Sequence, residues 1–283
     1  MYSRLFPGKR TNSFRLSLEN VQIRGIITLE NVHLRNALPL GAHGALSGGR
    51  VAILSRGVSL LLSRKIEKDI LKWISDSHKA LLVCGVRQAG KTFIIRECLR
   101  AAGCDYVEFN LIQEPVIVDI LAKATGTDDL MMRLSLYSDK KIEANKTFIF
   151  FDEIQRYKEI VTKIKFLVED GRYRYIMSGS LLGVEIYNLK SAPVGYLQTL
   201  NLYPLDFEEF LQVFNVNDAI LQTLKTAFDN RQPVDETIHR RMLELFHLYL
   251  IIGVMPAAVE AYRTTGNIDE VIREHEAIIE QYK

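Results

Sequence analysis

Apolar residues occur along the chain in two patterns, short runs and longer stretches with a helical period. The runs predict strands at 80–83, 106–111, 147–151, 173–177 and 197–203. The stretches predict helices at 61–76, 91–102, 114–123, 128–138 and 154–170, with four more at 219–230, 236–252, 257–263 and 268–282. Because strands and helices alternate up to residue 203, we expect an α/β fold, a three-layer sandwich around a mainly parallel five-stranded sheet, followed by a helical segment.

Three details of these helices can also be predicted. The helix at 91–102 is expected to bury one apolar face, made of Phe93, Ile94, Ile95, Cys98 and Leu99. Gly171 is expected to end the helix at 154–170, because glycine favours the position after a helix. Asp206 is expected to N-cap a short helix that follows the last strand.

Composition and charge narrow the class of protein. The chain of 283 residues is 48% hydrophobic and 25% charged, which is typical of a globular protein with one or two domains. Residues 1–60 hold eight Lys and Arg against two Glu, and the remainder of the chain is acidic. An acidic body gives no electrostatic sign of nucleic-acid binding. We expect residues 1–60 to be a poorly ordered basic extension, with a targeting or nucleic-acid-binding arm as the alternative.

Cysteine spacing and hydropathy bear on the compartment. Cys84, Cys98 and Cys104 fit neither a disulfide framework nor a zinc site, so they are expected to be packing residues in a reducing compartment. The longest apolar run, 248–259, is interrupted by Gly253 and Pro256 and is too short to span a bilayer. We therefore expect a cytoplasmic protein without a membrane segment.

Residues 85–92 carry the strongest chemical signal. Their sequence fits G-x-x-x-x-G-K-[ST] and reads Gly85, Val86, Arg87, Gln88, Ala89, Gly90, Lys91, Thr92. A predicted strand precedes the motif and a predicted helix follows it, as a phosphate-binding P-loop (Walker A) requires. Glycine at 85 and 90 is expected to allow backbone conformations that point N–H groups at anionic oxygens. Lys91 would contact the β- and γ-phosphates of ATP, and the Thr92 hydroxyl would be a ligand of Mg²⁺.

A second chemical centre follows the third predicted strand. Asp152 and Glu153 come directly after four bulky apolar residues, at the end of a strand where parallel α/β sheets bind ligands. This is the pattern of a Walker B box, in which Asp152 would hold Mg²⁺ and Glu153 would deprotonate the attacking water. Ser178, after the fourth strand, is the candidate for a hydroxyl that contacts the γ-phosphate or the water. A simple Ser/Gly turn is the alternative for Ser178.

Together these motifs resemble a large prokaryotic family of AAA+-type P-loop ATPases, in which the P-loop domain precedes a C-terminal domain of unknown function. The residues that carry the resemblance are both Walker boxes, Asp152–Gln155, Ser178–Ser180, Tyr203–Phe210 and Tyr249–Pro256. The resemblance implies the AAA+ strand order, ATP and Mg²⁺ as ligands, and the roles given above for Lys91, Thr92, Asp152, Glu153 and Ser178. The resemblance runs from about residue 61 to the end. With the basic extension at 1–60, we therefore expect three parts: the extension, an ATP-binding domain at 61–213, and at 214–283 the start of an incomplete second domain.

This chain departs from the family pattern in three respects. Many members carry Gly-Arg before the fifth strand, where this chain has Gly195-Tyr196, so an arginine acting on the γ-phosphate is not assigned. Family members also usually continue beyond residue 283. Val254 stands where the family has the second glycine of its Gly-Gly pair.

The sequence leaves three functions open. The first is an Mg²⁺-dependent ATP hydrolase, converting ATP and water to ADP and phosphate, that couples nucleotide state to movement of the helical part. The second is a nucleotide-gated binding or regulatory module for DNA or a protein, with negligible hydrolysis. The third, a small-molecule P-loop kinase, is disfavoured because no Arg-rich lid segment is apparent. ATP and ADP are the expected partners, and a homo-oligomer and a DNA or protein partner stay open.

Overall fold

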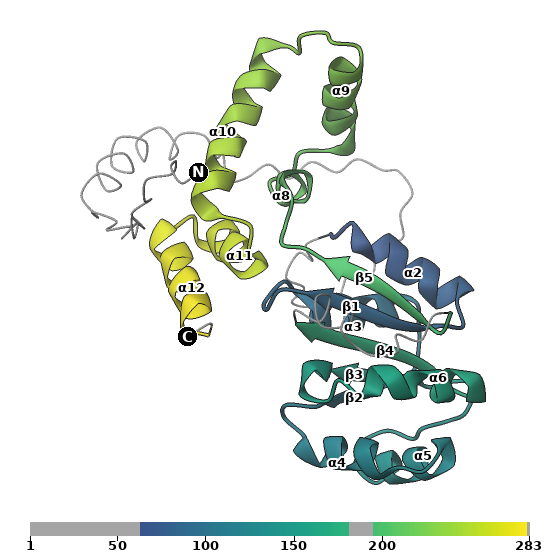
Figure 1. The fold of residues 1–283 in the computed structure, drawn as a ribbon. Coiled ribbons are helices and arrows are strands. Elements are labelled where there is room, and N and C mark those ends of the chain that lie inside the picture. Colours follow the sequence, from purple (N-terminus) through teal and green to yellow (C-terminus); the bar gives the residue numbers. More distant parts are fainter. Residues whose placement is uncertain (1–62, 181–194, 282–283) are drawn as a thin grey trace, which may run out of the picture. The chain divides into compact units, whose positions relative to one another are not determined.

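The computed structural model describes residues 63–180 and 195–281, and the expected extension at 1–60 lies outside the described residues. The centre of the fold is a five-stranded sheet in the order β2-β3-β4-β1-β5, in which every pair is parallel. The strands are β1 (Ala80–Gly85), β2 (Tyr106–Asn110), β3 (Phe148–Asp152), β4 (Arg174–Ser180) and β5 (Leu197–Leu202). The predicted α/β class and strand order are confirmed (Figure 1).

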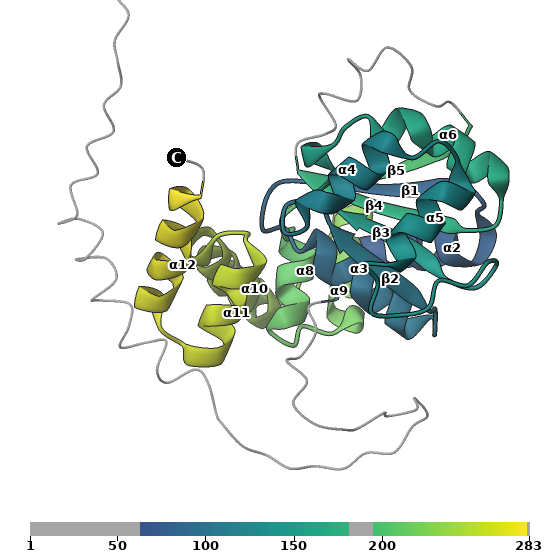
Figure 2. The ribbon, with the colours of Figure 1, turned by 90° about the horizontal axis from the view of Figure 1, so that it is seen from below.

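Helices cover both faces of the sheet. One apolar cluster packs α4 (Pro115–Lys123), α5 (Thr127–Ser135) and α6 (Ile160–Asp170) against alternate residues of the strands. The other cluster packs α2 (Ile66–Asp76) and α3 (Lys91–Ala101) against the opposite face. All five residues of β3 are buried, because this strand is covered on both faces. The result is the predicted three-layer sandwich (Figures 1 and 2).

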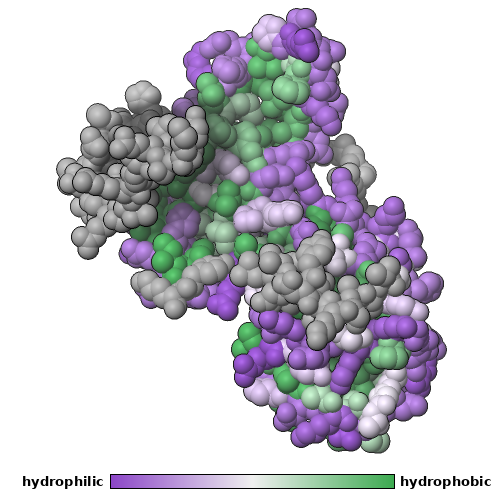
Figure 3. Space-filling view, in the orientation of Figure 1, coloured by the Kyte–Doolittle hydropathy of each residue, from purple (hydrophilic) through white to green (hydrophobic). Residues whose placement is uncertain are grey.

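The helices that follow the sheet build a third apolar cluster of their own. They are α8 (Phe207–Val213), α9 (Asp218–Asp229), α10 (Glu236–Ile252), α11 (Pro256–Thr265) and α12 (Ile268–Glu280). This cluster includes Leu248 and Ile252 of α10 and Val259 of α11. By contrast α9 buries none of its residues, and the space-filling view shows hydrophobic side chains gathered over α9 and α10 (Figure 3).

Three expectations about the helices need correction. Residues 154–170 do not form one helix: the 3-10 turn η1 (Ile154–Arg156) comes first, Tyr157 leaves the helical region at φ −142°, and α6 follows. Within the described residues, the first helix begins at Ile66 and not at Leu61. Phe93 is 50% exposed, because it lies on the same side of α3 as the exposed residues Arg96 and Arg100. Gly171 and Asp206 cap their helices as predicted, and Asp206 forms a capping box with Glu209.

The described helices can be compared with the length and hydropathy that a bilayer requires. None of the helices in 63–180 and 195–281 is by itself long and apolar enough to cross a bilayer. The pair α10 and α11 passes the same length and composition test only jointly, and it is bent by 118° at the break between the two helices.

Candidate functional site

The loop after β1 has two residues with left-handed backbone conformations. Gln88 has φ +61° and Gly90 has φ +91°, and α3 begins at the next residue. Gly85 is not in this region, so the expectation that both glycines supply unusual conformations holds for Gly90 alone. At Gly85 the reason is space: an added Cβ would lie 2.2 Å from the Leu202 carbonyl oxygen of β5. Gly85 therefore lets β5 approach the start of the loop closely.

Lys91 lies at the start of α3 with only 5% of its surface exposed. Its ammonium group donates to two carbonyls of the loop, Val86 at 2.8 Å and Gly85 at 3.2 Å. Burial lowers the pKa of Lys91, and the carboxylates of Glu153 and Asp152 oppose that change. The buried cation thus rests on neutral acceptors, which an anionic ligand could replace.

Asp152 ends β3 and is 2% exposed. Its carboxylate accepts hydrogen bonds from three side chains on three different elements. Thr92 Oγ1 of α3 donates at 3.0 Å, Asn110 Nδ2 of β2 donates at 3.1 Å, and the hydroxyl of Ser178 in β4 donates as well. The carboxyl ends of parallel strands meet at one edge of a sheet, and here this edge gathers the polar groups predicted from separate parts of the sequence.

Ser178 lies in a different place from the predicted one, and Asn110 was not predicted. Ser178 is fully buried and lies inside β4, which continues to Ser180, so it does not occupy a turn after the strand. Asn110 was missed. Its Oδ1 also accepts from the N–H groups of Ile112 and Gln113, both at 3.0 Å. An asparagine at the end of a strand next to the predicted carboxylate strand was the available signal.

Glu153 has a left-handed backbone conformation, with φ +59° and ψ +44°. Its carboxylate accepts a hydrogen bond from the side-chain amide of Gln155. The same amide accepts from the backbone N–H of Ser180 at 3.2 Å. The turn η1 brings Gln155 back over Glu153, which explains why a continuous helix does not start at Ile154.

Oxygen donors suited to Mg²⁺ lie together at this edge. The Thr92 hydroxyl and the Asp152 carboxylate are adjacent, and Mg²⁺ usually takes one or two such protein ligands and completes its shell with phosphates and water. Among the described residues there is no group of three or more His, Cys, Asp or Glu that could hold a metal ion. The residues present therefore fit a nucleotide-bound Mg²⁺ and not a metal site built from protein alone.

Two of the remaining loop residues, Arg87 and Gln88, contact the residue that follows α12. Arg87 Nη1 donates to the Gln281 carbonyl at 3.0 Å, and Gln88 Nε2 donates to the Gln281 side chain at 2.7 Å. Val86 accepts from Lys91, as described above, and Ala89 is fully buried. The outer surface of the loop thus contacts the helical part of the chain.

Burial raises the pKa of all three thiols, which favours their protonated form. Burial raises the pKa of Cys84 to about 11 and that of Cys98 to about 12. Cys104 is half-buried, and all three are free cysteines. Their predicted role as packing residues is confirmed for Cys84 and Cys98, which belong to the two sheet clusters.

Comparison with known families identifies the central part of this chain. Residues 77–211 match a family model described as an AAA domain. Residues 77–211 form an AAA-type P-loop domain. The match spans both predicted Walker segments and the whole sheet and ends inside α8. None of the curated proteins matches the chain.

Solved structures similar to the chain include a Walker-type ATPase, an ORC1 protein and PCH-2. A Walker-type ATPase of Pyrococcus abyssi aligns over 78% of this chain and 73% of its own, with 13% identity and a TM-score of 0.46. The ORC1 protein of Aeropyrum pernix, solved in complex with DNA, aligns over 75% and 65%, with 16% identity and a TM-score of 0.37. PCH-2 of C. elegans aligns over 78% and 66%, with 12% identity and a TM-score of 0.39. Similarity at this level says nothing about what this chain binds or does.

Proposed function

We propose that this chain is an Mg²⁺-dependent ATP hydrolase that passes its nucleotide state to the helical part. The observation that carries the proposal is the contact between Thr92, Asp152 and Ser178, which come from α3, β3 and β4 and meet beside a buried Lys91. Lys91, Asp152 and Ser178 are buried, and burying polar side chains is costly unless they serve a ligand or each other. In P-loop proteins, groups of these kinds bind nucleotide phosphates and Mg²⁺.

Each residue has a defined role in the proposal. The loop at 85–92 supplies backbone N–H groups and Lys91 supplies a positive charge to the phosphates. Thr92 and Asp152 hold Mg²⁺, which when bound neutralises charge that develops on the phosphate oxygens. Glu153 takes the proton of the water that attacks the γ-phosphate, with Gln155 fixing the orientation of its carboxylate. The Ser178 hydroxyl donates a hydrogen bond to the Asp152 carboxylate and so positions it.

A second candidate function is a nucleotide-gated module that hydrolyses ATP negligibly and binds DNA or a protein. The observation in its favour is Tyr196, which occupies the position where an arginine is expected and whose hydroxyl donates to Glu169 at 2.7 Å. A missing arginine finger can lower the rate of hydrolysis by several orders of magnitude. A homo-oligomer in which a neighbouring copy supplies that arginine would reconcile the two candidates. In both cases we propose a cytoplasmic protein with an ATP-binding domain at 61–213 and a helical region from 214.

A binding titration tests the nucleotide binding that both candidate functions require. ATP and ADP are titrated by calorimetry into the purified chain, first with Mg²⁺ and then with EDTA. We expect binding of both nucleotides, and weaker ATP binding in EDTA, because Asp152 and Thr92 then lose their link to the phosphates. Failure of both nucleotides to bind would contradict both candidates.

A further inference from the structure

Arg64 is a buried charge outside the predicted nucleotide site. It lies two residues before α2 and is 7% exposed, and the other buried charged side chains among the described residues are Lys91, Asp152 and Glu209. Burying a guanidinium is costly unless its donors are matched by acceptors in fixed positions. The acceptors around Arg64 therefore indicate what its position achieves.

The guanidinium holds three separate segments of the chain. Its Nη1 donates to the Ala89 carbonyl of the P-loop at 3.0 Å, and its Nη2 donates to the Tyr203 carbonyl after β5 at 2.5 Å. Its Nε lies 3.2 Å from Glu209 Oε1 of α8, an ion pair without hydrogen-bond geometry. A planar group with donors in a rigid fork can satisfy acceptors in three directions, which a lysine cannot.

The contact with Ala89 bears directly on the loop. Ala89 lies between Gln88 and Gly90, both with positive φ, and the peptide between Ala89 and Gly90 leads directly into the left-handed conformation of Gly90. In a trans peptide the carbonyl and the following N–H point in opposite directions. By holding the Ala89 carbonyl, Arg64 also fixes the direction of the Gly90 N–H, which is one of the donors that a P-loop offers to phosphate.

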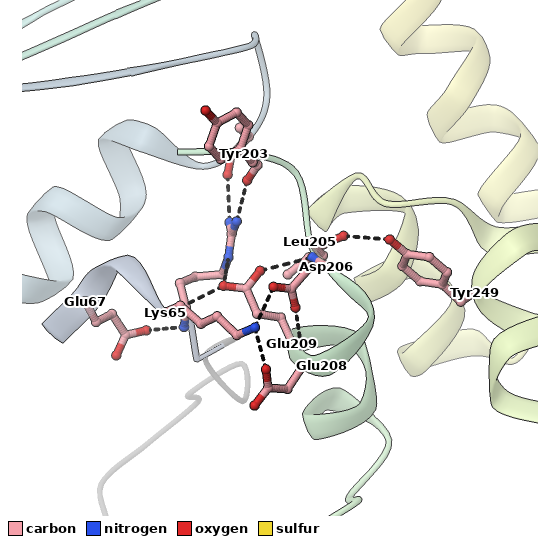
Figure 4. Close-up of polar contacts among 10 residues, drawn as sticks. Lys65, Glu67, Tyr203, Leu205, Asp206, Glu208, Glu209 and Tyr249 are labelled. Atoms are coloured by element: carbon pink, nitrogen blue, oxygen red, sulfur yellow. Dashed lines mark hydrogen bonds and ion pairs between the residues drawn. The ribbon is translucent and has the colours of Figure 1, made fainter. Parts of the chain in front are cut away.

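Glu209 anchors the other end of the guanidinium. It is 6% exposed, and besides Arg64 its Oε1 accepts from the Lys65 N–H at 2.8 Å while its Oε2 accepts from the Asp206 N–H at 3.2 Å. Figure 4 shows Glu209 and Asp206 at the start of α8, facing Lys65. The carboxylate that completes the capping box of α8 is therefore the one that pairs with Arg64.

The segment before α8 is in turn bound to the helical part. The hydroxyl of Tyr249 in α10 donates to the Leu205 carbonyl at 3.1 Å (Figure 4). The Leu205 N–H donates to the Val254 carbonyl at 2.9 Å. A continuous series of contacts thus leads from the P-loop through Arg64 and Glu209 to α8, and from the start of α8 to α10.

We propose that Arg64 is a positioning residue for the nucleotide site: it holds the P-loop in its phosphate-binding conformation and connects it to α8. This inference rests on the proposed nucleotide binding, and it adds a residue outside both Walker boxes. The acceptor on the loop is a backbone carbonyl, so the connection depends on Arg64 and Glu209 and not on the side chains of the loop.

The test compares two conservative substitutions in the full chain. Arg64→Lys keeps the charge but loses the fork, and Arg174→Lys is the matched control. Arg174 is half-buried and also holds backbone carbonyls, those of Ile74, Trp73 and Ser77, at the start of β4 far from the loop. We expect Arg64→Lys to raise the Kd for ATP about tenfold, the effect of about one lost hydrogen bond, at a temperature where the protein is folded. Arg174→Lys is expected to leave the Kd within twofold.

Hydrogen exchange gives a readout that needs no nucleotide. In the free protein, Arg64→Lys is expected to speed amide exchange in residues 85–92, and Arg174→Lys is not. Glu209→Gln should raise the Kd and the exchange rate in the same direction by a smaller factor, because the neutral amide still offers an oxygen to Arg64. A folded Arg64→Lys variant with parental Kd and parental exchange in the loop would overturn the inference. If the parent binds no nucleotide, the proposed function fails, and exchange alone decides the role of Arg64.

Discussion

The two edges of the sheet bury polar groups in different ways. At the amino edge Arg174 donates to three backbone carbonyls at 2.6–2.8 Å, and its guanidinium lies over the rings of Trp73 and Phe148 at 4.8 and 4.6 Å. At the carboxyl edge Lys91 donates to loop carbonyls, and Asp152 accepts from Thr92 and Ser178. The first arrangement joins α2 to the sheet. In the second, the side chains contact one another and a loop whose backbone groups suit phosphate.

The two edges show how a buried charge that only stabilises the fold differs from one that is available to a ligand. Arg174 is half-buried and Lys91 is buried, and burial lowers the pKa of each. Arg174 is enclosed by a helix end and two aromatic rings, and its two Nη atoms donate to backbone carbonyls, whereas its buried Nε has no hydrogen-bond partner among the described residues. Lys91 is held by two carbonyls beside two carboxylates, an arrangement with a place for a more strongly bound anion. Substitutions at the two positions should therefore have opposite effects on binding and stability.

The largest effect is expected for Lys91→Ala. Loss of the phosphate charge should weaken ATP binding at least about a hundredfold, while the free energy of unfolding stays the same or rises because a buried charge is removed. Calorimetric titration and urea denaturation measure the two quantities. Lys91→Met, which keeps an apolar stem, controls for the lost packing. Parental affinity in both variants would show that Lys91 is structural, like Arg174.

For Arg174→Lys we expect lower stability and unchanged ATP affinity. A lysine can replace only part of the three carbonyl contacts and stacks less well on the rings, so the free energy of unfolding should fall by about 2 kcal/mol. Equilibrium denaturation in urea gives this value. Nucleotide affinity is measured in the same preparation. If the affinity fell as well, the proposed difference between a structural amino edge and a nucleotide-binding carboxyl edge would be contradicted.

Local sequence patterns predicted most of the fold and supplied the residues of the proposed nucleotide site. The N-cap at Asp206, the end of α6 at Gly171 and the bounds of α10 depend on neighbouring residues, so periodicity and capping rules sufficed. The P-loop and the acidic pair could be recognised because each motif is short and continuous. That they meet at one edge follows from the parallel order of the strands.

What the sequence did not predict depends on contacts between distant segments. The break at Tyr157 arises because Gln155 reaches back to Glu153 and to Ser180, which lies 25 residues further along the chain. Arg64 contacts a carbonyl 25 residues away and another 139 residues away, and nothing in its neighbourhood marks it as more than a charged residue before a helix. Asn110 likewise gains its role only beside Asp152.

The most direct test of the account measures Mg²⁺-dependent phosphate release from ATP by the parent chain and by Glu153→Gln, each with a parallel ATP titration. Glu159→Gln, an exposed acid near the same turn, is the control. We predict turnover in the parent and in the control, and parental ATP affinity with no turnover in Glu153→Gln, because the amide cannot accept the proton of the attacking water. Hydrolysis by Glu153→Gln at the parental rate would contradict the assignment of the base and, with it, the proposed mechanism.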